Sequence, residues 1–157
     1  MGMIEVIASL ALAGLLMTGA TAFVFNTMTV TGNTQNRMHA IMQVENAGYW
    51  ISRDIQMSDN FTLGEDAGFP IQIMWKDIDQ NEYEVTYSLN QTSIVRSLIK
   101  NEESPVQNLI ARNINTSASL TNLNSSDGLL VLNITSSSED NDVSRTYKIK
   151  SRLDFES

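Results

Sequence analysis

The hydrophobic pattern changes twice along the chain and divides it into three regimes. The first is continuous apolarity from Met1 to about Phe25. In the second, apolar residues recur at spacings of three and four, at Ile41, Val44, Gly48, Ile51 and Ile55. From Pro70 onward apolar residues alternate with polar ones. These periods predict an apolar helix, an amphipathic helix and a set of β-strands, in that order.

The first two regimes are expected to form one continuous helix. No proline interrupts residues 1–69, so the two segments can join into a helix of roughly 55 residues, with a bend at Gly32-Asn33 as the expected weak point. The helix is expected to end near Ser58-Asp-Asn60. Gly48 lies on the buried stripe, where it is expected to let another backbone approach closely.

The alternating regime predicts antiparallel strands joined by hairpins. Its first strand places Ile71, Ile73 and Trp75 on one face. The later segments expected to be strands cover residues 83–89, 93–99, 107–114, 129–135 and 143–153, with a hairpin turn at Asn90-Gln91. In the last of them, polar and basic residues share one face while Tyr147 and Ile149 share the other, which predicts one wet and one buried face.

The sequence therefore predicts an α+β fold in which a long N-terminal helix packs on an antiparallel β-sheet head. Residues 1–30 are expected to form an apolar transmembrane or filament-core helix. Residues 31–58 are its amphipathic continuation, and residues 59–157 form a β-rich globular head. A chain of 157 residues leaves room for one modest core after the apolar segment.

Composition excludes several classes of function. The chain carries 10 basic and 18 acidic residues, a net charge of -8, and its basic residues are scattered, so nucleic acid is not an expected partner. It has no cysteine, so no disulfide framework, thiolate metal site or thiol nucleophile is available. Packing must therefore supply the stability of the head.

Candidate chemistry is sparse, and no enzyme, cofactor or metal site is expected. Residues 77–84 begin like a calcium loop, yet Glu82 stands where the required glycine belongs, so a solvated hairpin turn is expected. Residues 139–142 are expected to form a similar polar turn. His39, the one histidine in the sequence, has no metal-binding companions and is expected at the surface.

Glu5 is the one charged side chain among the first 36 residues. The apolar segment Val6–Phe25 that follows it would span ~30 Å as a helix, which matches the hydrocarbon core of a bilayer. An unpaired carboxylate there costs on the order of 3 kcal/mol, so a positive partner is expected. In the alternative, Glu5 extends to the membrane interface of an ordinary single-pass protein.

The segment Ile4-Glu-Val-Ile-Ala-Ser-Leu-Ala-Leu-Ala-Gly-Leu-Leu16 resembles the mature N-terminus of the type IV pilin superfamily. There a glutamate follows four mostly apolar residues and precedes a helix rich in alanine and leucine. A weaker likeness lies in Ile51–Met57 and the hairpin after it, which look like minor pilins of the PilW type and J-type pseudopilins of type II secretion. The resemblance covers the whole architecture.

The resemblance implies that a prepilin peptidase removes a short leader and N-methylates Met1 as the first mature residue. It also implies that Glu5 meets the α-amino group of a neighbouring subunit inside a filament. The Met1-Gly2-Met3 start departs from the usual family pattern and leaves a second register open, in which cleavage follows Gly2. We prefer the first register and expect a leader upstream of Met1.

Small residues along the apolar helix are expected to permit close helix packing in such a filament. They are Ala8, Ala11, Gly14, Gly19 and Ala22. Residues 14–21 contain two glycines and two threonines, and filaments of the family suggest that this stretch can lose helicity. Ala22 stands where the family often has proline, and this departure weighs against melting.

The leading hypothesis is a structural subunit that polymerises through its N-terminal helix into a type IV pilus-like extracellular filament, with the head displayed outside. Its expected partners are copies of itself or related pilins, the prepilin peptidase and an inner-membrane assembly machinery, with the cytoplasmic membrane as its location before assembly. One alternative is a minor pseudopilin of a periplasmic type II secretion pseudopilus. The other is a bitopic membrane protein with an exported binding domain.

Overall fold

A computed structural model describes residues 2–65, 68–124, 129–138 and 141–150. Within these ranges the chain forms one helix and eight strands. They are α1 (Met3–Met57), β1 (Asn60–Gly64), β2 (Gly68–Lys76), β3 (Glu82–Asn90), β4 (Ser93–Lys100), β5 (Val106–Ala111), β6 (Leu120–Asn124), β7 (Leu129–Ser138) and β8 (Asn141–Lys150). The α+β class predicted from the sequence is confirmed.

The chain divides into two compact units, residues 1–36 and residues 37–157, and α1 contributes residues to both. In the described part of the first unit all residues are helical except Gly2. The helix is continuous through Gly32 and Asn33, and it ends at Met57, one residue before the segment predicted to end it. The predicted boundaries at residues 30 and 58 stay a prediction.

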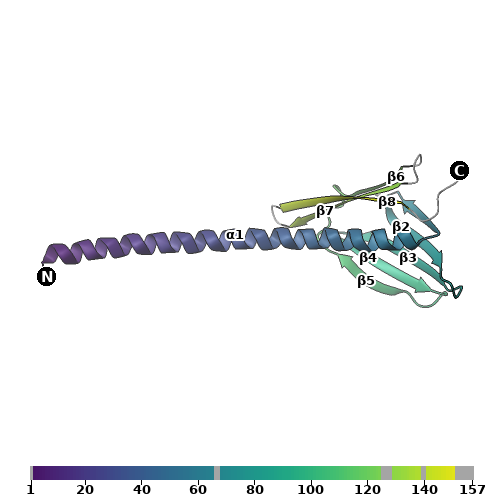
Figure 1. Cartoon of the computed structure of the whole chain (residues 1–157), viewed down its shortest axis with the longest axis horizontal. Helices are drawn as coiled ribbons and strands as arrows, with labels where there is room; N and C mark the ends of the chain where they lie inside the picture. Colours follow the sequence, from purple (N-terminus) through teal and green to yellow (C-terminus); the bar gives the residue numbers. More distant parts are fainter. Residues whose placement is uncertain (1, 66–67, 125–128, 139–140, 151–157) are drawn as a thin grey trace. The chain divides into compact units, whose positions relative to one another are not determined.

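The strands of the second unit form two antiparallel sheets, one with the order β1-β2-β3-β4-β5 and one with the order β6-β7-β8. Figure 1 shows them on opposite sides of the C-terminal turns of α1. The predicted hairpins are confirmed: Asn90 faces Ser93 at the end of the β3–β4 hairpin, and Leu132 faces Tyr147 in the β7–β8 pair. Residues 151–153 of the predicted last strand lie outside the described residues.

Two strands and several strand ends differ from the sequence prediction. The sequence pattern does not indicate β1 and β6, because Asn60–Gly64 is only five residues long and Leu120–Asn124 lies in a stretch rich in Asn, Ser and Thr. Strand β7 runs three residues beyond its predicted end at residue 135, and β8 begins two residues before its predicted start at residue 143. The strand predicted at residues 107–114 begins at Val106 and ends at Ala111. Ile114 instead forms an isolated bridge with Ser136 of the other sheet.

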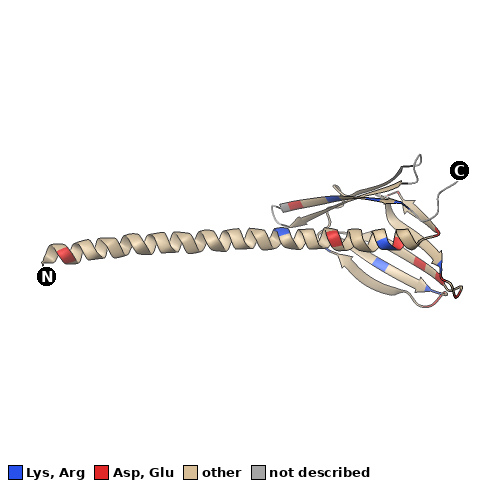
Figure 2. Cartoon of the chain, in the orientation of Figure 1, with Lys and Arg blue, Asp and Glu red and all other residues tan. Residues whose placement is uncertain are grey.

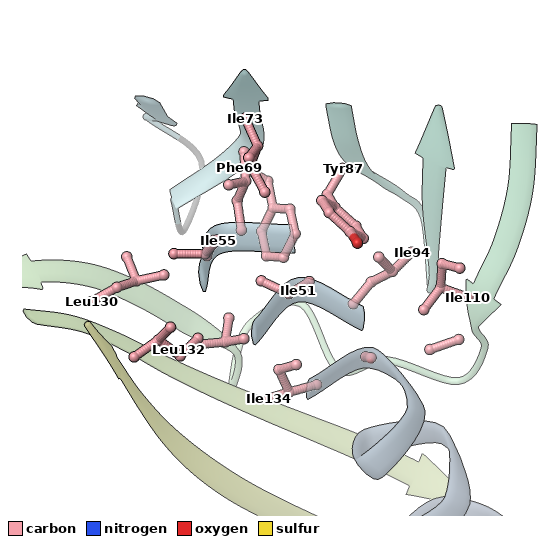
Figure 3. Close-up of a cluster of buried hydrophobic side chains, with 14 of the residues drawn as sticks. Ile51, Ile55, Phe69, Ile73, Tyr87, Ile94, Ile110, Leu130, Leu132 and Ile134 are labelled. Carbon is pink, nitrogen blue, oxygen red and sulfur yellow. The ribbon is translucent and has the colours of Figure 1, made fainter. Parts of the chain in front are cut away.

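The core lies where helix α1 meets the two sheets, and Figure 3 shows its side chains. Helix residues Ile51 and Ile55 are completely buried there. The five-stranded sheet and β7 supply buried side chains around them, including Ile71, Ile73, Val85, Tyr87, Ile94, Leu130, Leu132 and Ile134. Each aliphatic side chain that is fully buried contributes about 1.5–3 kcal/mol, so this cluster holds the head together.

Gly48 is the point at which β8 packs closely on the helix. A Cβ atom placed on Gly48 would overlap the ring of Tyr147, so this position has room only for a hydrogen side chain. The Tyr147 hydroxyl donates a hydrogen bond to the carbonyl oxygen of Val44, 3.2 Å away. The predicted close approach is therefore present, but an aromatic ring, and not a second backbone, makes it.

Candidate functional site

The first unit of the chain is an apolar helix without a covering. Residues 2–31 are all exposed. Its most apolar 18-residue window has a mean hydropathy of 1.9, and none of that window is buried within the protein. By length and composition this helix is able to cross a membrane. The observation is compatible with membrane anchoring, and it identifies a large apolar surface that needs another environment than water.

Glu5 lies in the first turn of α1, three residues after Gly2. Its Oε2 atom accepts a hydrogen bond from the backbone N–H of Gly2 at 3.1 Å. This is half of a capping box, in which an acidic side chain at the third helical position satisfies the amide that precedes the helix. Sequence reasoning missed this bond, although the spacing of Gly2 and Glu5 was the signal that could have revealed it.

The Gly2 hydrogen bond leaves the charge of Glu5 in place. An amide donor stabilises a carboxylate, and the helix N-terminus adds the equivalent of roughly half a positive charge. Neither is a counter-ion, and the first basic residue in the sequence is Arg37. Met1, the expected source of the partner amine and the expected processing site, lies outside the described residues.

The hydroxyl side chains of the first unit are all satisfied by the helix itself. Each serine and threonine among residues 2–36 donates to a backbone carbonyl one turn earlier, at distances of 2.8–3.1 Å. These donors are Ser9, Thr18, Thr21, Thr27, Thr29, Thr31 and Thr34. Such bonds let hydroxyls enter an apolar environment without losing a partner. Residues 14–21, where melting was considered, are helical here.

The five small residues named as packing positions lie on one side of the helix. At 100° per residue, Ala8, Ala11, Gly14, Gly19 and Ala22 fall within an arc of about 140°. They are exposed, and a Cβ placed on Gly14 or Gly19 would have nothing within 4 Å. Ile7 and Leu15 fall within the same arc, so this side of the helix combines small residues with larger aliphatic ones. That a second helix packs on this side stays a prediction.

The remaining polar candidates form surface structure. Asp77 closes the β2–β3 turn by accepting hydrogen bonds from the backbone and side-chain amides of Asn81, and these bonds lower the pKa of its carboxyl. His39 is exposed, as expected. Residues 139–140 of the expected acidic turn lie outside the described residues. Among the described residues, no group of three or more His, Cys, Asp or Glu side chains could hold a metal ion.

The structure adds a buried polar cluster that sequence reasoning missed. Asp54, on the last turns of α1, has no exposed surface. Its Oδ2 atom accepts hydrogen bonds from the Tyr87 hydroxyl and from Nε of Arg96, each at 2.6 Å. Burial, followed by the nearby Asp54 charge, raises the pKa of Tyr87 well above its ordinary value. The cluster joins the helix to β3 and β4.

Trp50 stands beside this cluster between two guanidinium groups. The Arg53 guanidinium lies 4.6 Å from a Trp50 ring centroid and that of Arg96 lies 5.3 Å away. Both distances are within the range of cation–π attraction. Because Asp54 and Arg96 are buried and their ion pair joins the helix to β4, we assign the cluster a structural role, which is to fix where the helix sits on the sheet.

No family model, no curated protein and no solved structure matches this chain. The fold and the site must therefore be interpreted from their own geometry. A long apolar N-terminal helix, whose C-terminal turns pack on an antiparallel sheet, is consistent with a pilin-like fold. Among the site residues predicted from the sequence, Glu5 is the one that carries a charge, and the apolar residues around it are exposed.

Proposed function

We propose that this protein is a structural subunit that polymerises through its N-terminal helix into a type IV pilus-like extracellular filament. One observation carries the proposal: Glu5 is the single charge among residues 2–31, which are all exposed and mostly apolar. A plain membrane anchor has no need of a carboxylate in its apolar end. An assembly that must set each helix in one axial position does have a use for it.

The exposed helix explains why copies of the chain would associate. In the membrane, lipid covers the apolar side chains; outside the membrane, neighbouring helices of the same kind must do so. The small-residue side, from Ala8 to Ala22, offers a surface for that contact. The positive α-amino group of a neighbouring subunit would then pair with Glu5, and a slip by one helical turn would leave both charges in an apolar bundle.

This proposal places the protein in the cytoplasmic membrane before assembly and in an extracellular filament afterwards. A prepilin peptidase would expose and methylate the N-terminus of Met1, and an inner-membrane machinery would extract the subunit. A periplasmic pseudopilus of a type II secretion system uses the same chemistry at Glu5. It is a variant of the same proposal that differs in destination and length of the filament.

A second candidate function is a single-pass membrane protein with an exported binding domain. The hydrogen bond from the Gly2 amide to Glu5 favours it, because that bond gives the carboxylate a partner within its own chain. In this case Glu5 would serve as a helix cap near the membrane surface. Copies of the chain would then insert and fold without forming a polymer.

The substitution Glu5→Gln separates the two candidates better than Glu5→Ala. Glutamine keeps an oxygen that can accept the Gly2 hydrogen bond, and it is also the second residue allowed in a capping box. It removes only the charge. The full-length protein would be expressed in its own cells, and the filaments sheared from those cells would be compared with the amount of protein in the membrane fraction. Glu5→Asp, which keeps the charge on a shorter side chain, is the matched control.

For the filament subunit we expect Glu5→Gln to lower the filament yield by about a hundredfold or more, since breaking a buried charge pair costs about 3–5 kcal/mol. Membrane insertion should not change, and Glu5→Asp should retain part of the yield. If Glu5→Gln filaments form at the wild-type level, or if the wild-type chain makes none in its own cells, the single-pass protein becomes the better assignment.

A further inference from the structure

Residues 26–36 of α1 lie between two parts of the helix that have different support. On one side, the apolar residues 6–25 form a helix long enough to fill the hydrocarbon core of a bilayer. On the other side, the buried helix residues lie between Ala40 and Ile55, in the core of the head. Within the stretch itself, residues 26–31 and 33–35 are exposed, and a Cβ atom placed on Gly32 would have nothing within 4 Å.

The sequence of this stretch is a poor helix former. Its eleven residues include four threonines, three asparagines, one valine and one glycine. Threonine and valine lose side-chain freedom in a helix, asparagine side chains compete for backbone hydrogen bonds, and glycine loses the most backbone entropy. The stretch contains no alanine, leucine, glutamate, lysine or arginine, which are among the best helix formers.

Charge pairs do not support this stretch either. Exposed helices are commonly stabilised by opposite charges three or four residues apart. Here the nearest charged residues along the chain are Glu5 and Arg37, and Figure 2 shows α1 without acidic or basic side chains between them. An isolated helix of about eleven residues is marginal in water even when it is rich in alanine. Residues 26–36 therefore lack the local interactions that would keep them helical in water.

The threonine hydroxyls make the stability of this helix depend on water. All four threonines of the stretch donate to the carbonyl oxygen four residues earlier, at distances of 2.8–3.1 Å. In an apolar environment, hydroxyl and backbone groups have no other partners, so the helix must be kept. In water both kinds of group can bond to solvent instead, and back-bonded hydroxyls then slightly destabilise a helix.

We propose that residues 26–36 are a hydration-controlled segment of the helix. In a subunit that stands alone in the membrane, water surrounds these residues and they unfold into a tether. Where neighbouring chains exclude water, they take the helical form that the structure shows. The tether follows from either candidate function, whereas the return to a helix rests on the proposed filament. Residues 14–21 differ, because they fall within the bilayer-length apolar segment, where lipid replaces water.

The change of form alters the length of the chain between membrane and head. Eleven residues span ~16 Å as an α-helix and at most ~36–40 Å when fully extended. A subunit in the membrane would thus carry its head on a tether that reaches about 20 Å further than the helix does. Ordering the tether costs conformational entropy, so it would occur only where contacts with other chains offset that cost.

Hydrogen exchange tests the tether directly. The full-length protein would be placed in phosphatidylcholine vesicles at a low protein-to-lipid ratio, and exchange would be followed by mass spectrometry of its peptides. We expect the backbone amides of residues 26–36 to exchange about a hundredfold or more faster than those of residues 44–55, which are packed in the head. Equal protection of the two segments would overturn the inference.

A variant with better helix formers should restore protection. It carries four substitutions, Thr27→Ala, Thr29→Ala, Thr31→Ala and Gly32→Ala. Because alanine has the highest helix propensity, exchange of residues 26–36 in vesicles should slow by about tenfold or more. Thr18→Ala with Thr21→Ala makes the same kind of change within the apolar segment. This matched control should leave the exchange of residues 26–36 unchanged.

A distance measurement compares the two environments, and it is simple here because the chain has no cysteine of its own. Spin labels on Val24→Cys and Met38→Cys would bracket the segment at two exposed positions. Fourteen residues of helix separate them by ~21 Å. We expect a broad distribution of distances in vesicles. In sheared filaments, with labelled chains diluted among unlabelled ones, we expect one narrow distance near that value.

The matched control is a second pair of labels with the same spacing in the supported part of the helix. Met42 and Gln56 are also exposed and fourteen residues apart. Labels on Met42→Cys and Gln56→Cys should give a narrow distance in both environments, because the helix between these positions packs on the head. A difference between the two pairs therefore reports on residues 26–36 and not on the label.

The outcomes separate this inference from the proposed function. Slow exchange and a narrow Val24–Met38 distance in vesicles would overturn the tether and leave the filament proposal standing. A distribution that stays broad in filaments would overturn the control by hydration. If no filaments form, the filament proposal fails, while fast exchange in vesicles still supports the tether.

Discussion

The ring of Tyr147 lies directly against Gly48, at a position where a Cβ atom would overlap it. The two residues are 99 positions apart in the sequence and belong to β8 and α1. Their contact is reinforced nearby by an ion pair between Arg145 and Glu45 at 3.3 Å. A strand that is the edge of its sheet is thereby held on the helix by one aromatic ring and one charge pair.

We expect Gly48→Ala to destabilise the head, although alanine is the better helix former. Helix propensity would contribute about 1 kcal/mol in its favour, while forcing Tyr147 away costs typically 1–3 kcal/mol. Denaturation of the full chain in detergent, followed by Trp fluorescence, measures the difference. The substitution Gly32→Ala is the control, because a Cβ there has nothing within 4 Å and should raise or preserve stability. Equal effects at both positions would contradict the packing argument.

The buried carboxylate of Asp54 should be among the least replaceable groups in the head. Asp54→Ala leaves the Arg96 guanidinium and the Tyr87 hydroxyl buried without their acceptor, and we expect a loss of about 3–5 kcal/mol. Arg53 also lies near Asp54, at 3.8 Å, but its side chain is 43 % exposed. Arg53→Ala should therefore cost less than about 1 kcal/mol. Similar losses for both variants would show that the Arg96 pair does not anchor the helix.

Stability should fall with rising pH from about pH 10, where tyrosine ordinarily titrates. Burial, followed by the charge of Glu45, raises the pKa of Tyr147 to about 12, and Tyr87 is shifted in the same direction. A group whose pKa is higher in the folded state than in the unfolded state contributes stability to the fold. That contribution is complete below the unfolded-state pKa and is lost as the pH rises through the folded-state pKa. Unfolding measured from pH 8 to 11 should show a shallower decline for Tyr147→Phe than for wild type. Tyr49→Phe, at a 61 % exposed ring, is the control and should keep the wild-type slope.

The small-residue side of the apolar helix should be sensitive to bulk. We expect Ala11→Leu to reduce the filament yield by about tenfold or more, because the longer side chain would hold a neighbouring helix away. Ala13→Leu adds the same side chain on nearly the opposite side of the helix, about 160° from Ala11, and should be tolerated. Membrane insertion of both variants should be normal. Equal losses of filament yield in the two variants would contradict the idea that one side of the helix makes the packing contact.

The mass of the N-terminus of the native protein decides the processing register. We expect a mature chain that begins with N-methylated Met1, since this places Glu5 at the fifth position. Mass spectrometry of the N-terminal peptide measures cleavage and methylation together. A chain beginning at Met3, or one that retains a leader, would contradict the preferred register and weaken the pairing proposed for Glu5.

Regular periodicity made most of the fold predictable. The spacing from Val44 to Ile55 identified the buried side of the helix, and the alternation at Tyr83, Val85 and Tyr87 identified a strand with one buried face. Both patterns are local, because the spacing in the sequence between successive apolar residues determines which face of the helix or strand they share. Five-residue strands such as β1 and β6 are too short to show an alternating pattern. They become strands because they pair with the neighbouring strands β2 and β7.

The contacts between distant residues could not be predicted in this way. Asp54 and Arg96 are separated by 42 positions and are charged residues of types usually found at the surface, so nothing local indicates that they are buried together. The charge at Glu5 was recognisable because its neighbours are uniformly apolar. Its bond to Gly2 spans only three residues, so the capping-box spacing made it predictable from the sequence.

The back-bonded hydroxyls of residues 2–36 have a consequence for transfer of the helix between environments. Because each of these side chains carries its acceptor on its own helix, none must exchange a bond with lipid, water or a neighbouring protein when the surroundings change. Transfer of this helix out of one apolar medium into another is then nearly neutral for them. The free-energy difference between the two locations is then set by the other polar groups of this segment, which are the Glu5 carboxylate and amide side chains such as that of Asn26.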